Sequence, residues 1–401
     1  MTDRWDRFVE TDHVIYDFTR LVLRRHDRFA TGIDRIDLAF AEDLAASFGD
    51  RLIFAVMVGK GGLLLSCDEV RPLLQELARR WGGVRVDRSV SSARSRDNTG
   101  DPFARLILLE KARQKLSLGA DNRFMRQLKA LLAGRPATYI VANHHGFARI
   151  SGFLDRLQTE IDLRVRGYIH DLIPIRYPEY IRPGHIGRQE AYLDAFRQAG
   201  GQLFANSETT ARDIACYCAE QGWQCGPVEV LLPALAMPDL RAGEPCAKVR
   251  EIVATGKPYF VTVGTIEPRK NHLLLLHMWR RWVREGRADL PHLHVVGQRG
   301  WQNESVFQLL DRCSAIRPHV SEHGDLDDVD LFHLVLHARA LLFPSFAEGL
   351  GLPMLEADRL GVPVIASDLA VFRELALERA TLLDPLDVPS WQEACLRAIK
   401  L

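Results

Sequence analysis

The sequence lacks a net charge, since 52 lysine and arginine residues balance 52 aspartate and glutamate residues. A chain without a net positive charge creates no overall electrostatic field that attracts nucleic acid, so we exclude nucleic acid as a partner. The sequence also lacks any apolar run near the roughly 20 residues that cross a bilayer. Its first residues, MTDRWDRFVETDH, are too polar for a signal peptide. We therefore expect a cytoplasmic location.

Cysteine is also scarce, with seven residues spread over 401 positions. An odd number of cysteines in a chain without an export signal predicts a reduced state. Cys216, Cys218 and Cys225 lie close together, but C-x-C-x6-C is not a recognised zinc spacing and no histidine lies near it. The sequence therefore predicts no structural metal at these cysteines.

The composition, 47% hydrophobic and 26% charged, is typical of a globular protein. A chain of 401 residues is long enough for two domains, each with its own core. Residues 238–248, PDLRAGEPCAK, have the composition of a linker. We therefore predict an α/β protein with one domain at 1–240 and a second at 241–401.

The most informative pattern covers residues 340–367, ALLFPSFAEGLGLPMLEADRLGVPVIAS. Residues 341–343 are typical of a buried strand, and Pro353 fits the first turn of a helix that ends near Gly361. Residues 362–366 are typical of the next strand. This order of strand, glycine turn, helix and strand is the building block of a parallel sheet.

The turn of this unit carries the chemistry. Gly349 and Gly351 lie just before a helix N-terminus, where bare backbone N–H groups favour an anion such as a diphosphate. Glu348 and Glu356 lie on either side of seven residues, and two carboxylates beside a phosphate site are better suited to accept hydrogen bonds from sugar hydroxyls. A glycine turn with two solvated glutamates is the alternative, because such turns are common.

Four segments together resemble a known signature: Phe343-Pro344-Ser345, the residues EGLGLP at 348–353, Leu355-Glu356-Ala357 and GVPVI at 361–365. They are similar to the retaining, nucleotide-sugar-dependent glycosyltransferases of family 4, also called group 1. The resemblance implies the GT-B fold, in which two Rossmann-like domains face a central cleft. It also implies that the first domain handles the acceptor and the second the donor, a nucleoside diphosphate sugar, with neither a metal nor a cofactor.

The resemblance also implies roles for individual residues. His170 would face the donor sugar, Lys270 would stabilise the leaving diphosphate, and Glu348 would hold sugar hydroxyls, so these three are the candidate catalytic residues. The candidate donor-binding residues are Gly32, Gly264, Thr265, Arg269, Lys270, Gly349, Leu350, Gly351 and Glu356, of which Glu356 would bind the ribose. Many family members have arginine where this chain has Thr265, so either Arg269 supplies that charge or the leaving group receives less help. A histidine fixed by a core hydrogen bond is the alternative for His170.

A helical stretch at 102–135 has a basic bias, with eight positive residues against two negative ones. A basic amphipathic helix favours an anionic membrane surface, so we predict a peripheral contact with the inner membrane; a solvated helix face is the alternative. His144 and His145 follow a predicted strand at 137–142 without a neighbouring carboxylate, and they indicate a polar loop rather than a metal site.

The resembling sequences are frequent among bacterial mannosyl- and rhamnosyltransferases that build surface polysaccharides such as lipopolysaccharide and capsule. GDP-mannose and a lipid-linked glycan are therefore the expected donor and acceptor. Members of the family usually continue with helices that return to the first domain, whereas this chain stops at Leu401. One expectation is therefore that this chain is truncated or is a piece of a larger polypeptide. Two other functions stay open: a nucleotide-sugar epimerase or phosphorylase, and a non-catalytic sugar-nucleotide-binding or scaffold module.

Overall fold

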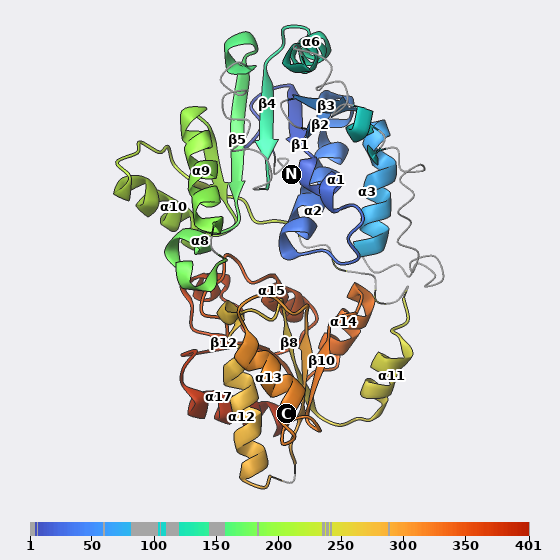
Figure 1. The fold of residues 1–401 in the computed structure, drawn as a ribbon, viewed down its shortest axis with the longest axis vertical. Helices are drawn as coiled ribbons and strands as arrows, with labels where there is room; N and C mark the ends of the chain where they lie inside the picture. The colour runs from blue at the N-terminus through green and yellow to red at the C-terminus, as the bar shows by residue number, and fades with distance from the viewer. Residues whose placement is uncertain are drawn as a thin grey trace.

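The computed structural model describes residues 5, 7–58, 61–81, 103–104, 106–109, 120–143, 157–182, 184–234, 237, 240, 243–287 and 289–400. These residues form two sheets, which lie one above the other along the long axis of the molecule (Figure 1). The chain passes from the first sheet to the second between Val230 and Tyr259. The predicted pair of Rossmann-like α/β domains is confirmed, and the exact boundary near residue 240 stays a prediction.

The N-terminal sheet has seven strands in the order β3-β2-β1-β4-β5-β6-β7. All neighbours are parallel except β2 and β3, which form an antiparallel edge that the sequence analysis did not predict. The strands are β1 (His13–Asp17), β2 (Leu52–Val58), β3 (Gly61–Leu65), β4 (Ala137–Val141), β5 (Leu163–Ile169), β6 (Gln202–Ala205) and β7 (Glu229–Val230). The helices around them include α1 (Thr19–Arg24), α2 (Gly32–Phe48), α3 (Cys67–Trp81), α6 (Ala120–Leu132), α8 (Ile173–Arg176), α9 (His185–Gln198) and α10 (Glu208–Glu220).

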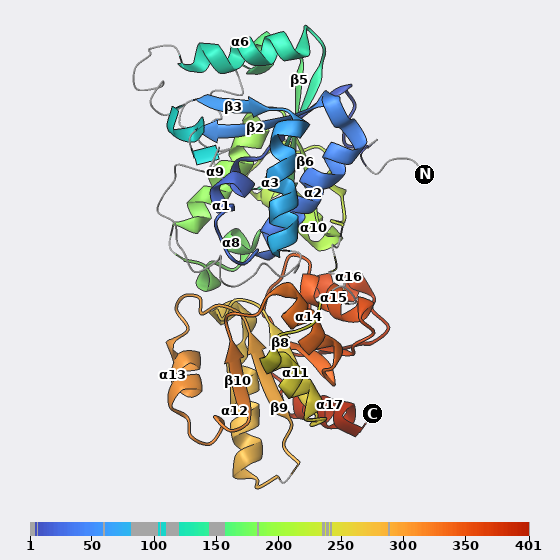
Figure 2. The ribbon, with the colours of Figure 1, turned by 90° about the vertical axis from the view of Figure 1, so that its right-hand side faces the viewer.

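The C-terminal sheet has six parallel strands in the order β10-β9-β8-β11-β12-β13. They are β8 (Tyr259–Val263), β9 (His292–Val296), β10 (Val320–His323), β11 (Ala340–Phe343), β12 (Val364–Ser367) and β13 (Ala380–Leu383). The helices are α11 (Ala247–Ala254), α12 (His272–Arg284), α13 (Glu304–Arg312), α14 (Asp328–Leu336), α15 (Leu352–Arg359), α16 (Ala370–Leu375) and α17 (Val388–Lys400). Both views place α14, α15 and α16 on the side of this domain that faces the other one (Figures 1 and 2).

The alternation of strand side chains explains why each sheet has two cores. In β1, Ile15 packs into one apolar cluster while Val14 and Tyr16 pack into another, because successive side chains point to opposite faces. In β11, Leu341 and Leu342 divide in the same way between the two clusters of the C-terminal domain. Helices therefore cover both faces of each sheet, and the loops at the strand ends are left to form the site.

The structure corrects one prediction about the cysteines. Cys218 at the end of α10 forms a disulfide with Cys225, whereas the sequence analysis predicted reduced cysteines throughout. The spacing of seven residues brings the pair together because the chain reverses after α10, where the N–H of Trp223 donates to the Cys218 carbonyl. Cys216 is exposed and free.

Two further predictions are only partly covered by the structure. Of the basic stretch at 102–135, the structure describes 103–104, 106–109 and 120–135, which include α6, and the other residues lie outside the described ones. His144 and His145 also lie outside them. In the described part of the chain, none of the helices combines the length and apolar character needed to span a bilayer.

Candidate active site

The glycine turn lies between β11 and α15, as the sequence predicts. Gly351 caps the helix with a φ of +95°, a left-handed conformation that favours glycine, and a Cβ there would lie 2.8 Å from Cε1 of Phe372. A proline follows in the first turn of α15, where its missing N–H costs no hydrogen bond. Leu350 is buried between the two glycines. The turn therefore presents backbone to the domain boundary rather than side chains.

Two cations meet one carboxylate beside this turn. Lys270 Nζ lies 2.5 Å from Glu348 Oε1, and Arg269 Nη1 lies 2.8 Å from Glu348 Oε2. Burial alone would raise the pKa of Glu348, but the charges of Arg269 and Lys270 outweigh burial and lower this pKa to about 2. Glu348 is therefore ionised at any physiological pH, and the structure brings together three of the predicted site residues.

The chain after β8 positions these cations. Gly264 adopts a φ of +142°, and a Cβ there would lie 3.1 Å from Lys270 Cε, so a larger residue would press on the lysine. Lys270 also lies over the ring of Phe343, with Nζ 4.6 Å from its centroid. Burial lowers the pKa of Lys270, and Glu348 opposes that shift.

Thr265 and Arg269 occupy different surroundings. A Cβ at Gly300, in the loop after β9, would lie 2.8 Å from Thr265 Cγ2, which places Thr265 against that loop. Arg269 instead contacts Glu348 and also donates to the Ala347 carbonyl at 2.7 Å. Arg269 is thus the arginine that accompanies Lys270 at Glu348.

Glu356, the predicted ribose ligand, is buried in α15 and bound across the domain boundary. Its Oε1 lies 2.5 Å from Arg35 Nη1, and the other arm of Arg35 contacts Asp328 of α14. Burial raises the pKa of Glu356 to about 7; Arg35 opposes this rise and Asp328 adds to it. Glu356 therefore titrates near neutral pH, unlike Glu348.

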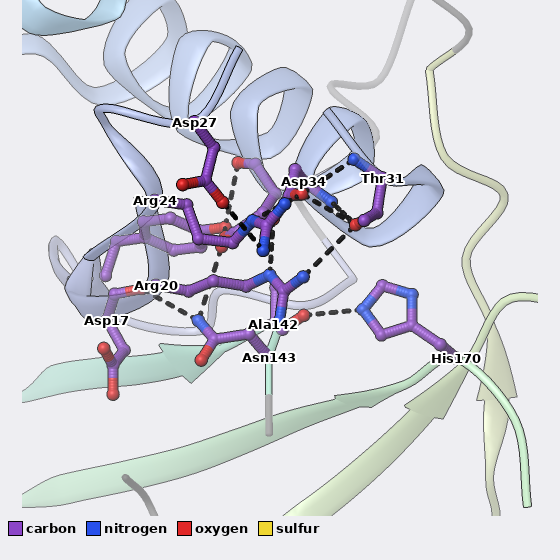
Figure 3. A network of polar contacts seen from close by, with 11 residues as sticks. Asp17, Arg20, Arg24, Asp27, Thr31, Asp34, Ala142, Asn143 and His170 are labelled. Atoms are coloured by element: carbon purple, nitrogen blue, oxygen red, sulfur yellow. Dashed lines mark hydrogen bonds and ion pairs between the residues drawn. The ribbon is translucent and has the colours of Figure 1, made fainter. Parts of the chain in front are cut away.

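His170 follows β5 and is 3% exposed. Its Nε2 lies 2.7 Å from the carbonyl oxygen of Ala142 (Figure 3), and the positive charge of Arg20 acts on the ring. Burial lowers the pKa of His170 to about 4, so the ring is neutral at pH 7. This contact is the core hydrogen bond that the sequence analysis gave as the alternative, and the structure leaves the role in sugar binding as a prediction.

Gly32 is the first residue of α2, directly after the N-cap Thr31. Thr31 and Asp34 form a capping box, in which the Asp34 carboxylate accepts from the Thr31 N–H at 2.7 Å. A Cβ at Gly32 would lie 3.3 Å from Leu352 Cδ1 of α15. The start of α2 therefore lies against the donor domain, next to the glycine turn.

The backbone of the turn also packs tightly against the first domain. A Cβ at Gly349 would overlap the His170 carbonyl oxygen and lie 2.9 Å from Asp171 Cβ. The Ser207 hydroxyl donates to the Gly349 carbonyl at 2.9 Å. A second contact between the domains, called the clamp below, is formed by the Glu374 carboxylate, which accepts from the N–H groups of Glu208 and Thr209 at 2.6 and 2.9 Å. The domains are therefore closed on the turn.

The structure places four further residues at this boundary to which the sequence analysis gave no role. They are Arg35, Asp171, Asp328 and Glu374. Ser207, which bonds the Gly349 carbonyl, is also the N-cap of α10 and accepts from the Thr210 N–H at 3.0 Å. Among the described residues, no group of three or more histidine, cysteine, aspartate or glutamate side chains is placed to hold a metal ion.

Two Rossmann-like domains that close on a glycine turn with the Glu-x7-Glu spacing define the GT-B class of protein. Residues 257–400 match the family model "Glycosyl transferases group 1". This segment of the chain is therefore similar to a group 1 glycosyltransferase domain, and the whole chain has the GT-B architecture.

Comparison with curated proteins gives relatives in bacterial polysaccharide synthesis. The chain is 30% identical over 244 residues to the serotype-specific mannosyltransferase WbdA of Escherichia coli, over 56% of this chain and 29% of WbdA. It is 35% identical over 142 residues to the O-antigen chain mannosyltransferase B of Escherichia coli, over 35% of this chain and 37% of that protein. The match thus spans less than a third of WbdA.

Comparison with solved structures supports the fold along nearly the full chain. Anabaena Alr3699/HepE in complex with UDP superposes with a TM-score of 0.59 at 12% identity, over 97% of this chain and 90% of that one. An α,α-trehalose-phosphate synthase from Burkholderia vietnamiensis gives a TM-score of 0.58 at 12% identity, over 97% and 89%. At these identities the likeness is one of fold.

Proposed function

We propose that this protein transfers a sugar from a nucleoside diphosphate sugar to a hydroxyl group of a glycan, with retention of configuration. The observation that carries the proposal is the meeting of Lys270, Arg269 and Glu348 beside the glycine turn, at the boundary between the domains. Two cations and a helix N-terminus suit a diphosphate, while an ionised glutamate suits sugar hydroxyls. The group 1 domain at 257–400 supports the same assignment.

In the proposed reaction, the bond between the anomeric carbon and the diphosphate oxygen breaks, and a bond to the acceptor oxygen forms on the same face. Lys270 and the N–H groups from Gly349 to Gly351 stabilise the negative charge that develops on the diphosphate. The acceptor proton passes to the leaving diphosphate oxygen, so no separate general base is required. Positioning and electrostatics carry the catalysis, and the proposal includes neither a metal nor an organic cofactor.

We propose GDP-mannose as the donor and a lipid-linked glycan as the acceptor. The support is that the relatives at 30% and 35% identity are named mannosyltransferases, one of them of the O-antigen chain. The structural neighbour HepE was solved with UDP, so uridine donors belong in the same test.

The test is a thermal-shift series with GDP, UDP, dTDP and their sugar conjugates. We expect GDP and GDP-mannose to raise the melting temperature, because a ligand at about 100 times its Kd stabilises the fold by about 2.7 kcal/mol. Glu356→Ala should abolish the shift. Transfer of the sugar to an acceptor, with retention of configuration, is then measured with the sugar conjugate of the nucleotide that binds.

Other results of this series would contradict the proposal. If no nucleotide stabilises the protein, the donor site is not functional and a scaffold role replaces transfer. If a nucleotide binds but the sugar nucleotide is epimerised without an acceptor, the protein is an isomerase on the same fold.

We also propose that the protein works at the cytoplasmic face of the membrane and contacts it through α6. This helix lies at the end of the N-terminal domain farthest from the C-terminal domain (Figure 1). Its exposed face carries Arg123, Arg126 and Lys129 together with Leu131, which is 51% exposed, while Phe124 and Leu128 face the core. Such a face is suited to anionic headgroups.

We expect Arg123→Gln combined with Arg126→Gln to weaken binding to phosphatidylglycerol vesicles about 30-fold, at about 1 kcal/mol for each charge. Cosedimentation measures the effect. The matched control is the pair Arg281→Gln and Arg284→Gln, two exposed arginines on α12 of the other domain. Equal loss in both pairs, or none in either, would remove α6 as the contact surface.

A further inference from the structure

Arg35 of α2 forms ion pairs with two residues of the other domain. It lies in the first turn of the helix, where Thr31 and Asp34 fix the helix start. Its guanidinium joins two carboxylates, with Glu356 Oε1 at 2.5 Å and Asp328 as the second partner. The arginine is 21% exposed and comes from a position 321 residues before Glu356. These ion pairs therefore join the two domains and are largely shielded from solvent, unlike ion pairs on the surface.

Glu356 is one of the residues that line a small apolar pocket. Leu331 and Phe332 of α14, Pro353 and Leu360 near α15, and Glu356 itself line this pocket. Arg35 lies over the Phe332 ring, with Cζ 5.6 Å from the centroid. Arg35 thus reaches a pocket of the donor domain from the opposite domain.

Arg35 contacts one of the two carboxylate oxygens of Glu356. It engages Oε1, and among the described residues no group donates to Oε2. A carboxylate has about four lone-pair sites, so one ion pair does not exhaust it. Asp328 receives the other arm of Arg35, which fixes the guanidinium plane. The ion pair with Arg35 therefore orients Glu356 and occupies only one of its two carboxylate oxygens.

Arg35 offsets the negative charge around Glu356. The charged groups that face Glu356 are Arg35 of α2, Asp328 of α14 and Arg359 of α15 itself. Burial and Asp328 raise the pKa of Glu356, whereas Arg35 is the larger of the two opposing charges. Removal of Arg35 leaves the buried Glu356 carboxylate facing the partly buried Asp328 carboxylate, and such a pair favours protonation.

We propose that Arg35 is a positioning residue of the donor site, which holds the Glu356 carboxylate in place for the ribose hydroxyls of a nucleoside diphosphate. The inference rests on the proposed function, because it requires the ribose of the nucleotide to bind at Glu356. Its consequence is that the first domain takes part in nucleotide binding without touching the nucleotide. Binding is then tightest when the domains are closed, since only then does Arg35 reach Glu356.

The test compares wild type with Arg35→Gln and Arg35→Lys by titration calorimetry, using the nucleoside diphosphate that stabilises wild type in the thermal series. We expect Arg35→Gln to raise Kd about 10-fold at pH 7, the scale of one hydrogen bond to a charged group. Arg35→Lys should recover part of the loss, because it restores the charge without the bidentate geometry. Wild-type affinity should increase as pH rises through about 7, since Glu356 ionises there. In Arg35→Gln this increase should move to higher pH.

The control is Arg182→Gln, which removes another arginine contact across the boundary, over the Trp301 ring at 4.8 Å, without touching Glu356. Its Kd and pH profile should match those of wild type. Wild-type affinity with an unshifted profile in Arg35→Gln would overturn the inference alone, and tighter binding would show that Arg35 blocks the site. If wild type binds no nucleotide, the proposed function fails and the inference fails with it.

Discussion

Replacing Lys270 with alanine should lower kcat by about 10² to 10³, the scale for removing one donor to a developing anion. The lysine lies beside the glycine turn and is paired with Glu348 at 2.5 Å. A diphosphate that forms during the reaction adds negative charge beside this cation, so the interaction is stronger in the transition state than in the ground state. KM for the donor should therefore change far less than kcat. Steady-state assays with the sugar nucleotide measure both constants.

The fold should survive this change. Arg269 still pairs with Glu348 at 2.8 Å, so no carboxylate is left without a cation. Lys257→Ala, an exposed lysine just before β8, is the matched control and should keep wild-type turnover. If Lys270→Ala melts like wild type and turns over at the wild-type rate, Lys270 does not stabilise the leaving group.

Replacing Gly349 with valine should lower kcat/KM at least about 100-fold while both domains stay folded. Any Cβ at this position overlaps the His170 carbonyl oxygen and presses on Asp171, and both groups belong to the other domain. The domains must therefore separate, which moves the acceptor side away from the donor side. A displacement of about 1 Å at reacting atoms is enough to cost about 100-fold in rate. Each sheet keeps its own core, because the overlap involves no core residue.

Small-angle scattering and circular dichroism distinguish this effect from unfolding. We expect a larger radius of gyration with an unchanged secondary-structure spectrum. Gly187→Ala in α9 is the control, since a Cβ there meets nothing within 4 Å and the helix is kept. A Gly349→Val protein with wild-type activity would mean that the closed arrangement is not the active one.

The elements of the fold could be predicted because their signals are local. The strand, turn, helix and strand at 340–367 depend on neighbours in sequence, and the structure places β11, α15 and β12 there. The antiparallel strand β3 was missed, because its sequence, GGLLL, is short and shows no alternation of polar and apolar residues, although the glycines at its start are a turn signal. The disulfide was missed because the prediction relied on compartment rather than on the reversal of the chain after α10.

The site could be predicted only on the donor side. Lys270, Arg269 and Glu348 belong to motifs within one domain, and the structure joins them. Arg35 could not be found in this way, because its partner Glu356 lies 321 positions away and only the docking of two domains brings them together. Nothing in the sequence around Arg35 distinguishes it from the other arginines of the first 40 residues.

The clamp formed by Glu374 and the start of α10 has a consequence for how the domains separate. A helix N-terminus binds anions in general, and here a carboxylate of the same chain occupies it from the other domain. An anion in solution that reaches the N–H groups of Glu208 and Thr209 therefore competes with Glu374. Because such an anion binds only when Glu374 has left, it shifts the population toward the open form. The composition of the salt, and not only its concentration, thus becomes one of the variables that set the balance between open and closed molecules.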